Sequence, residues 1–177
     1  MKQHMPYSPA KRNYPTLPSE LAAQLKLVQP VTDPTTGIQY YPCAVELSTG
    51  ETVDCVYLVE ADAYIHTWGF WPEDSSGTQM PIDLSSVVRV FESPHRLPRV
   101  IAQKLYDGGE SAMGGIIFEL EFTDGSVQTY EAGNVVDFVP LPKGQGINDI
   151  KEVHPHSGRN DPNRLEVLPH HWCFYSK

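Results

Sequence analysis

Histidine and cysteine side chains gather near the C-terminal end of the chain. His154 and His156 are two residues apart, and His170, His171 and Cys173 follow within twenty residues. Imidazole nitrogens and thiolates are good ligands for zinc, and four such groups can close a tetrahedral site. One interpretation is therefore a zinc site, or a metal-dependent enzyme, formed by His154, His156, His170 and Cys173.

Two features favour the alternative, in which these histidines lie on the surface or pack within the fold. Pro155 separates the first two and disfavours a regular strand that would place both rings on one face. His170 and His171 are adjacent, so their rings diverge, and the spacing matches no compact zinc motif. The sequence thus favours a protein without a cofactor, with zinc as the alternative.

A second group of residues suited to binding lies in an aromatic-rich segment. Residues 64–71 read Tyr-Ile-His-Thr-Trp-Gly-Phe-Trp. Tyrosine and tryptophan combine a large apolar area with a polar group, and they dominate binding hot spots when exposed. We expect a strand over residues 63–70 that presents alternate rings on one face, whereas the alternative is that the rings fill the core. The binding candidates are Tyr64, His66, Trp68, Phe70 and Trp71.

The catalytic motifs that we sought do not occur in the sequence. Ser111 lies in the glycine-flanked segment 108–115, but it is not part of Gly-x-Ser-x-Gly, and the segment has no lysine for a phosphate loop. Cys173 and a neighbouring histidine could act as nucleophile and base only if the chain bends near Trp172. The acidic residues form no pair that spacing singles out for acid–base catalysis. The sequence therefore favours a protein that is not an enzyme.

The charge distribution says more about partners than any motif. The net charge is −9, and residues 41–140 contain sixteen acidic and four basic side chains. This balance disfavours nucleic-acid binding, which requires clustered lysine and arginine. An acidic surface can instead attract a basic protein partner. We therefore expect a small soluble acidic protein-interaction domain, of which an inhibitor or immunity-type protein is one form, with the metal-binding interpretation as the alternative.

The sequence gives no indication of a membrane or secretory protein. No apolar run approaches the roughly 20 residues needed to span a bilayer, and residues 1–10 have no apolar region typical of a signal peptide. The odd number of cysteines, Cys43, Cys55 and Cys173, fits reduced thiols rather than a disulfide framework. We therefore expect a cytoplasmic protein.

Short apolar strands separated by turns predict an α+β fold dominated by β structure. One helix is expected between Pro18, which suits a first helical turn, and Pro30, which stops it. A second helix is expected over residues 97–107. The sequence does not choose between an antiparallel sheet, a small barrel and a sandwich. The expected strands cover residues 43–47, 53–59, 87–91, 116–122, 127–130 and 135–139.

An internal resemblance suggests two related β units. Residues 45–50, Val-Glu-Leu-Ser-Thr-Gly, match residues 120–125, Leu-Glu-Phe-Thr-Asp-Gly. Further along, residues 86–88 match residues 134–136. The match predicts a repeat, although hairpins with glycine turns also match by chance.

The domain organisation follows from these elements. We expect an extended N-terminal arm over residues 1–16 and a single globular domain over residues 17–177. Within that domain, the first β unit is expected at about residues 40–95 and the second at about residues 116–142. Residues 143–177 are expected to be irregular but pinned to the body by their apolar side chains.

Overall fold

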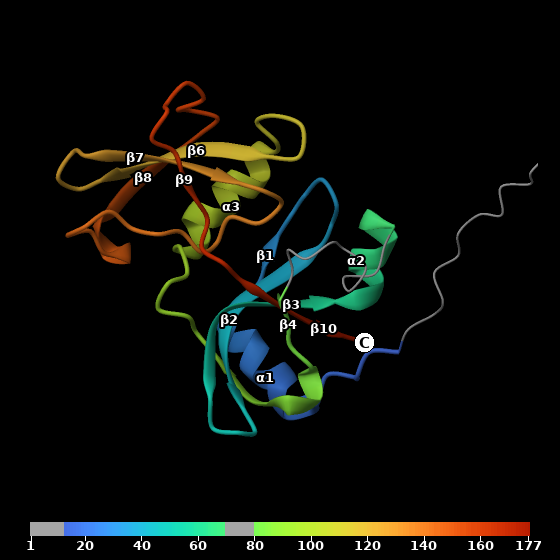
Figure 1. Cartoon of the computed structure of the whole chain (residues 1–177). Coiled ribbons are helices and arrows are strands. Elements are labelled where there is room, and N and C mark those ends of the chain that lie inside the picture. Colours follow the sequence, from blue (N-terminus) through green and yellow to red (C-terminus); the bar gives the residue numbers. More distant parts are fainter. Residues whose placement is uncertain (1–12, 70–79) are drawn as a thin grey trace, which may run out of the picture.

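The fold is strand-rich α+β and contains two mixed sheets. The computed structural model of the chain describes residues 13–69 and 80–177. Within these residues, strands form a six-stranded and a four-stranded sheet, and three α-helices pack beside them (Figure 1). The predicted α+β class is confirmed. Both sheets are mixed rather than purely antiparallel, however, and neither closes into a barrel in the described part of the chain.

The first sheet combines strands from both ends of the chain. Its members are β1 (Val31–Thr32), β2 (Gln39–Leu47), β3 (Thr52–Glu60), β4 (Met80–Pro81), β5 (Val87–Phe91) and β10 (His171–Tyr175). The strand order is β1-β2-β3-β10-β4, and β5 also pairs with β2. The pairings of β2 are antiparallel, whereas β10 runs parallel to both of its neighbours.

The second sheet is smaller and comes from the second half of the chain. Its members are β6 (Ile116–Phe122), β7 (Val127–Ala132), β8 (Ile150–Pro155) and β9 (Leu165–Glu166). The strand order is β8-β6-β7-β9. β6 pairs antiparallel with both β7 and β8, and β9 runs parallel to β7.

Two of the helices confirm the predicted ones. α1 (Ser19–Val28) and α3 (Arg99–Gly108) each follow a Leu-Pro pair, and the proline occupies the N-cap position in both. α1 packs against β5, and α3 packs against β8. Among the helices of the described residues, none is long and apolar enough to cross a membrane.

The aromatic-rich segment is helical, so the predicted strand over residues 63–70 is wrong. α2 (Ala61–Trp68) follows β3 directly and ends at Gly69, which has a φ of 73°. Its apolar side chains recur at helical spacing and face the core. These side chains are Ala61, Tyr64, Ile65 and Trp68. Aromatic and β-branched residues are enriched in strands, and for this reason the sequence suggested a strand here. The spacing of the apolar residues in this segment is nevertheless helical.

Two expectations about the C-terminal part of the chain are also wrong. Residues 135–139, predicted as a strand, form a buried irregular segment with a single bridge from Phe138 to Arg96. Residues 143–177 contain β8, β9 and β10 rather than only irregular chain. The apolar residues at 135–139 lie in the core that both sheets share, so burial rather than strand pairing explains their composition.

The two segments that resemble each other form turns with the same hydrogen bonds. Between β2 and β3, the Gly50 N–H donates to the carbonyl of Leu47. Between β6 and β7, the Gly125 N–H donates to the carbonyl of Phe122. Both glycines have a φ of 86°, the left-handed conformation that glycine adopts without steric cost.

The third strand of each unit also matches, although not at the residues that the sequence comparison paired. β5 joins β2 with a register shift next to Leu47, and β8 joins β6 with a register shift next to Phe122. Each strand follows a short 3-10 helix, η2 (Leu84–Ser86) before β5 and η3 (Ile147–Asp149) before β8. The counterpart of β5 is therefore β8, and not the segment around residues 134–136.

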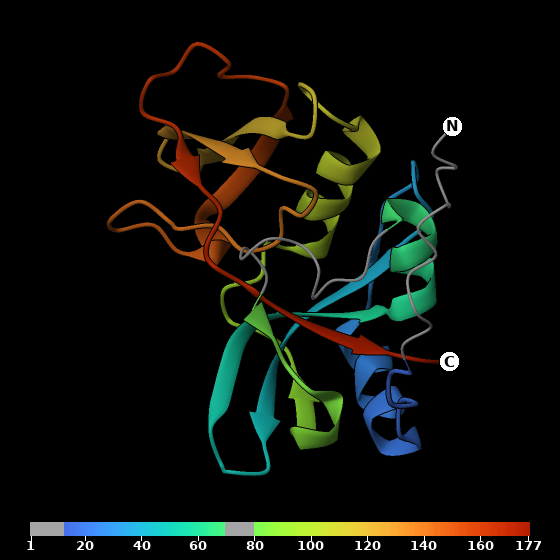
Figure 2. The same ribbon diagram turned by 45° about the vertical axis from the view of Figure 1, so that its right-hand side comes forward.

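A shared hydrophobic core joins the two sheets. Tyr57 on β3 and Phe118 on β6 belong to the same buried cluster. A second cluster fills the space between the first sheet and α1. The chain passes from β9 in the second sheet into β10 in the first (Figure 2). β10 carries Trp172, whose ring stacks on Tyr57 at a centroid distance of 5.1 Å. The last strand of the chain thus completes the sheet that the first strands begin.

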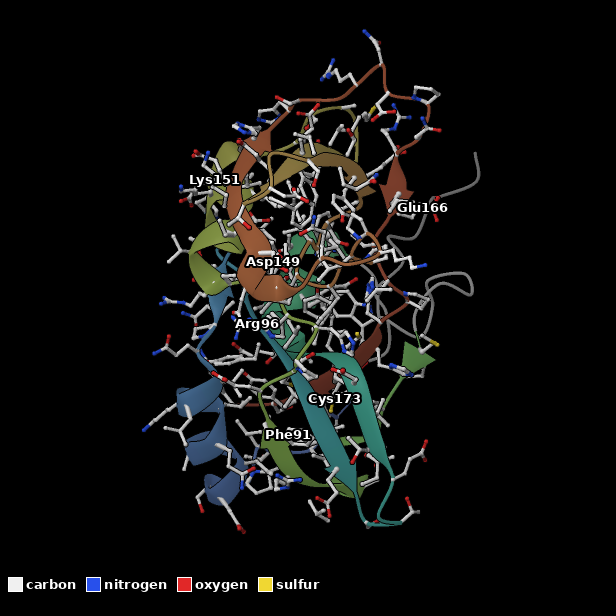
Figure 3. All side chains as sticks on the ribbon, turned by 90° about the vertical axis from the view of Figure 1, so that its left-hand side faces the viewer. Phe91, Arg96, Asp149, Lys151, Glu166 and Cys173 are labelled. Atoms are coloured by element: carbon white, nitrogen blue, oxygen red, sulfur yellow. The ribbon has the colours of Figure 1, made fainter. Side chains whose placement is uncertain are left out.

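A buried carboxyl group also connects the first sheet with α3, the helix that packs against β8 of the second sheet. The Oδ2 atom of Asp137 accepts hydrogen bonds from the hydroxyls of Tyr57 on β3 and Tyr106 on α3, at 3.0 and 2.5 Å. Burial raises the pKa of Asp137, against the opposing effects of the Tyr106 hydrogen bond and the Arg96 guanidinium. Arg96 lies between the two halves in Figure 3 and donates to main-chain carbonyls at the end of α1.

Candidate functional site

Two of the predicted zinc ligands are engaged in other contacts. His154 lies on β8, with its Nε2 atom 3.0 Å from a carboxylate oxygen of Glu121. His156 has contacts at both ring nitrogens, with the Ser111 hydroxyl at 2.7 Å and with the carbonyl of Gly108 at 2.8 Å. These contacts hold His154 against β6 and hold His156 against the end of α3 and the turn that follows it.

The other two predicted ligands lie near the first sheet. The His170 ring is 5.2 Å from the ring of Tyr57, and burial lowers the pKa of its imidazole. Cys173 is fully buried in the cluster beneath the first sheet, and burial raises the pKa of its thiol to about 12. The structure therefore does not bring His154, His156, His170 and Cys173 into one ligand group.

The aromatic binding candidates have mixed positions. Tyr64 is buried, with its ring 5.1 Å from that of Phe174, so it fills the core as the alternative interpretation holds. His66 is exposed and Trp68 is half-buried on α2. Phe70 and Trp71 lie outside the described residues. Binding through this segment stays a prediction.

The outward face of the second sheet is rich in glutamate. The strand alternation turns Phe118 and Leu120 into the core, so Glu119, Glu121 and their partners on β7 and β8 lie on the other side of the sheet. We call this surface the acidic face. Its glutamates are Glu119, Glu121, Glu131, Glu152 and Glu166.

Like charges stand directly opposite one another on the acidic face. Glu121 on β6 is paired with Glu152 on β8, and Glu131 on β7 is paired with Glu166 on β9. Directly opposed like charges destabilise a sheet. Two cationic side chains offset part of this repulsion. Lys151 lies 3.4 Å from Glu121, and Arg164 lies 3.3 Å from Glu131.

A hollow of about 390 Å³ opens at one corner of the acidic face. Glu131 and Glu166 line one side, and the glycine-flanked turn with the fully exposed Met113 lines the other. Glu166 and Lys151 mark opposite edges of the second sheet in Figure 3. The lining includes no lysine or arginine in the described part of the chain, so the hollow favours a cationic ligand.

The loop after β8 covers the centre of the acidic face, and its close approach depends on Gly158. Gly158 has a φ of 91°, and a Cβ atom there would lie 2.8 Å from Oγ1 of Thr129 and closer still to its Cγ2. We expect Gly158→Ala to lower the free energy of unfolding by about 2–4 kcal/mol through overpacking and backbone strain. Gly144→Ala is the control. Its φ is 85°, but no atom lies within 4 Å, so only a backbone cost of about 1 kcal/mol is expected. Urea unfolding measures both values, and equal losses would contradict the close contact.

One group of three metal-ligating side chains occurs within residues 13–69 and 80–177. Asp54 and Cys55 lie on β3, and His95 lies in the linker between β5 and α3. One donor atom from each residue lies within 4.8 Å of the others. Asp54 Oδ2 is 2.5 Å from His95 Nδ1, and Asp54 Oδ1 accepts a hydrogen bond from the Ser93 hydroxyl at 2.5 Å. The group lies at the edge of the molecule, since the His95 side chain is 59% exposed.

The backbone at this group is strained. Cys55 has a φ of 55°, at a bulge where the register between β2 and β3 shifts. A left-handed conformation costs a non-glycine residue about 1–2 kcal/mol, and such strain concentrates at functional sites. Burial and the charge of Asp54 raise the pKa of Cys55 to about 12, so the thiol is protonated near neutral pH and is a poor nucleophile.

Sequence reasoning missed this group for a physical reason. His95 is separated from Asp54 by 41 positions, and only the register of the first sheet brings the linker against the bulge. In the sequence, Cys55 was notable only because a hairpin would place it nearly opposite Cys43. In the structure, Val56 is the direct partner of Cys43, and all three cysteines are free thiols. The alternation of Glu119 and Glu121 along one strand, in contrast, was a visible signal of the acidic face.

Comparison of the chain with protein-family models, curated proteins and solved structures finds no match.

Proposed function

We propose that the protein is a binding module that captures a basic protein partner through the acidic face. The observation that carries this proposal is the direct opposition of Glu121 to Glu152 and of Glu131 to Glu166. Directly opposed like charges disfavour the free protein, and Lys151 at Glu121 and Arg164 at Glu131 offset only part of this effect. A cationic partner placed over the sheet would relieve the repulsion, so part of the binding free energy comes from strain already present in the free state.

The hollow beside Glu131 and Glu166 supplies a place for an individual lysine or arginine side chain of the partner. The carboxylates on one wall would accept hydrogen bonds from the cationic group. The exposed side chain of Met113 on the other wall would pack along the aliphatic part of the same residue. The proposed partner is thus recognised by the charge of the exposed glutamates beside the covering loop and by one inserted basic side chain.

The test uses an oligolysine peptide as the probe, titrated at low and high salt. We expect binding that weakens as salt rises, because Glu131, Glu152 and Glu166 of the acidic face are solvent-exposed. Replacing Glu131 and Glu166 together with glutamine should weaken binding about tenfold, or about 1.4 kcal/mol. Glu20→Gln, an exposed change on α1, is the control and should leave the affinity unchanged. Salt-independent binding, or an equal loss in the control, would contradict the proposal.

The stability of a charge-reversal variant gives a separate readout. Glu166→Lys replaces a like-charge pair with an opposite-charge pair, so it should raise the free energy of unfolding by about 0.5 kcal/mol while it weakens oligolysine binding. A variant that is more stable and binds less well distinguishes a binding surface from a merely structural one.

A further inference from the structure

We propose that Asp54, Cys55 and His95 form a binding site for a divalent transition-metal ion, with Zn²⁺ as the best chemical match. The site is independent of the acidic face, because it lies on the first sheet and on the linker that follows β5.

The donor types select the ion. A thiolate, an imidazole nitrogen and a carboxylate oxygen are the three kinds of side-chain ligand that Zn²⁺ accepts in proteins, at bond lengths of about 2.0–2.3 Å. Calcium and magnesium take oxygen ligands and would leave the sulfur and nitrogen unused. In a tetrahedral site these bond lengths separate the donors by roughly 3.3–3.8 Å. The three donor atoms already lie within 4.8 Å of one another, so side-chain rotations suffice to close the site.

The second unit forms the same hairpin without any of these donors. Thr129 stands at the position of Asp54, two residues after the start of the strand. Gly158 stands at the position of His95, when β8 is aligned with β5. Cys55 has no counterpart, because β7 pairs with β6 without a register shift. The fold thus does not require the three donors, and the bulge that holds Cys55 in the left-handed conformation is an addition to one unit.

Binding replaces protons by the metal ion. The Cys55 sulfur binds as the thiolate, so its proton is released to solvent. The ion also takes the place of the proton between Asp54 Oδ2 and His95 Nδ1, and this proton passes to Nε2 of the same ring or, if Nε2 already carries one, to solvent. The two atoms, now 2.5 Å apart, separate by about 1 Å. The Ser93 hydroxyl continues to hold the other carboxylate oxygen. The fourth position faces solvent beside the exposed His95 ring and takes a water molecule.

The test titrates the metal-free full-length chain with Zn²⁺ by calorimetry and with Co²⁺ by absorption spectroscopy. We expect a single ion per chain and, with Co²⁺, a near-ultraviolet sulfur-to-metal absorption band. Cys55→Gly should abolish that band and weaken Zn²⁺ binding at least ~100-fold, as should His95→Gln. Glycine tolerates the left-handed conformation at position 55, so this variant should keep or raise the melting temperature. Loss of metal binding in it cannot then be assigned to unfolding.

His154→Gln and Cys173→Ala are the matched controls, since they remove a histidine and a cysteine outside the group. Both should bind Zn²⁺ with the affinity of the unchanged protein. Failure of the unchanged protein to bind Zn²⁺, or a band that persists in Cys55→Gly, would overturn the proposal. Loss of binding in the controls alone would instead point to the C-terminal histidines. None of these outcomes depends on the acidic face.

Discussion

Replacing Asp137 with alanine is expected to lower the free energy of unfolding by about 2–4 kcal/mol. The carboxylate accepts hydrogen bonds from Tyr57 and Tyr106, and all three side chains are buried. Alanine would leave both hydroxyl donors without their acceptor in a site closed to water, and each unsatisfied buried group costs about 1–3 kcal/mol. Because Tyr57 and Tyr106 belong to different halves of the molecule, the loss should appear as weaker coupling between the sheets. Urea unfolding followed by tryptophan fluorescence measures it.

The same carboxyl group predicts a pH dependence of a definite sign. Burial raises the pKa of Asp137 in the folded state above its ordinary value. The folded state therefore favours the protonated form, and the resulting stabilisation is present below about pH 4 and is lost as the pH rises through the folded-state pKa. Asp137→Asn keeps an oxygen acceptor but cannot titrate.

The measurement is the difference in unfolding free energy between the unchanged protein and Asp137→Asn across the acidic and neutral range. The difference should shift in favour of the variant as the pH rises. Other carboxyl groups titrate equally in both proteins and cancel. A difference that does not vary with pH would show that Asp137 is ionised with its ordinary pKa in the folded state.

The parts of the fold that depend on local sequence were predictable. The strand over residues 87–91 and the one over residues 116–122 coincide with β5 and β6, because apolar alternation between turns is a local signal. Pro18 and Pro30 placed α1 for similar reasons. α2 was also encoded locally, but its tyrosine and tryptophan have strand preference, and the helical spacing of Ala61, Tyr64 and Trp68 carries the correct signal.

The parts that depend on distant pairing were not predictable. β10 pairs in parallel with β3 and β4, and residue composition does not show which strands a chain brings together over such separations. The candidate metal site has the same origin, because His95 meets Cys55 only through the register of the first sheet. The histidines near the C-terminus were prominent in the sequence for the opposite reason. They are close along the chain, but β8 and β10 belong to different sheets.

Removing residues 171–177 is expected to abolish the cooperative folding of the first sheet. These residues contain β10, which lies between β3 and β4 and buries Trp172, Cys173 and Phe174. Replacing Trp172 alone with alanine should cost about 3–5 kcal/mol. Loss of the whole strand also removes its ladder hydrogen bonds and exposes the edge of β3, so the total approaches the 5–15 kcal/mol by which domains are stable. Circular dichroism during thermal unfolding measures both changes.

Two controls separate the strand from the mere end of the chain. Removing Lys177 alone breaks its ion pair with Glu60, in which the lysine is exposed, and should change the stability by less than about 1 kcal/mol. A synthetic peptide covering residues 169–177, added to the truncated chain, should restore the melting transition by pairing with the freed edge of β3. Restoration would show that β10 stabilises the first sheet by strand pairing, in the parallel register from His171 opposite Val56 to Tyr175 opposite Glu60. A truncated chain that melts like the intact protein would instead mean that β2, β3 and β5 are stable with α1 alone, and that β10 is a peripheral strand.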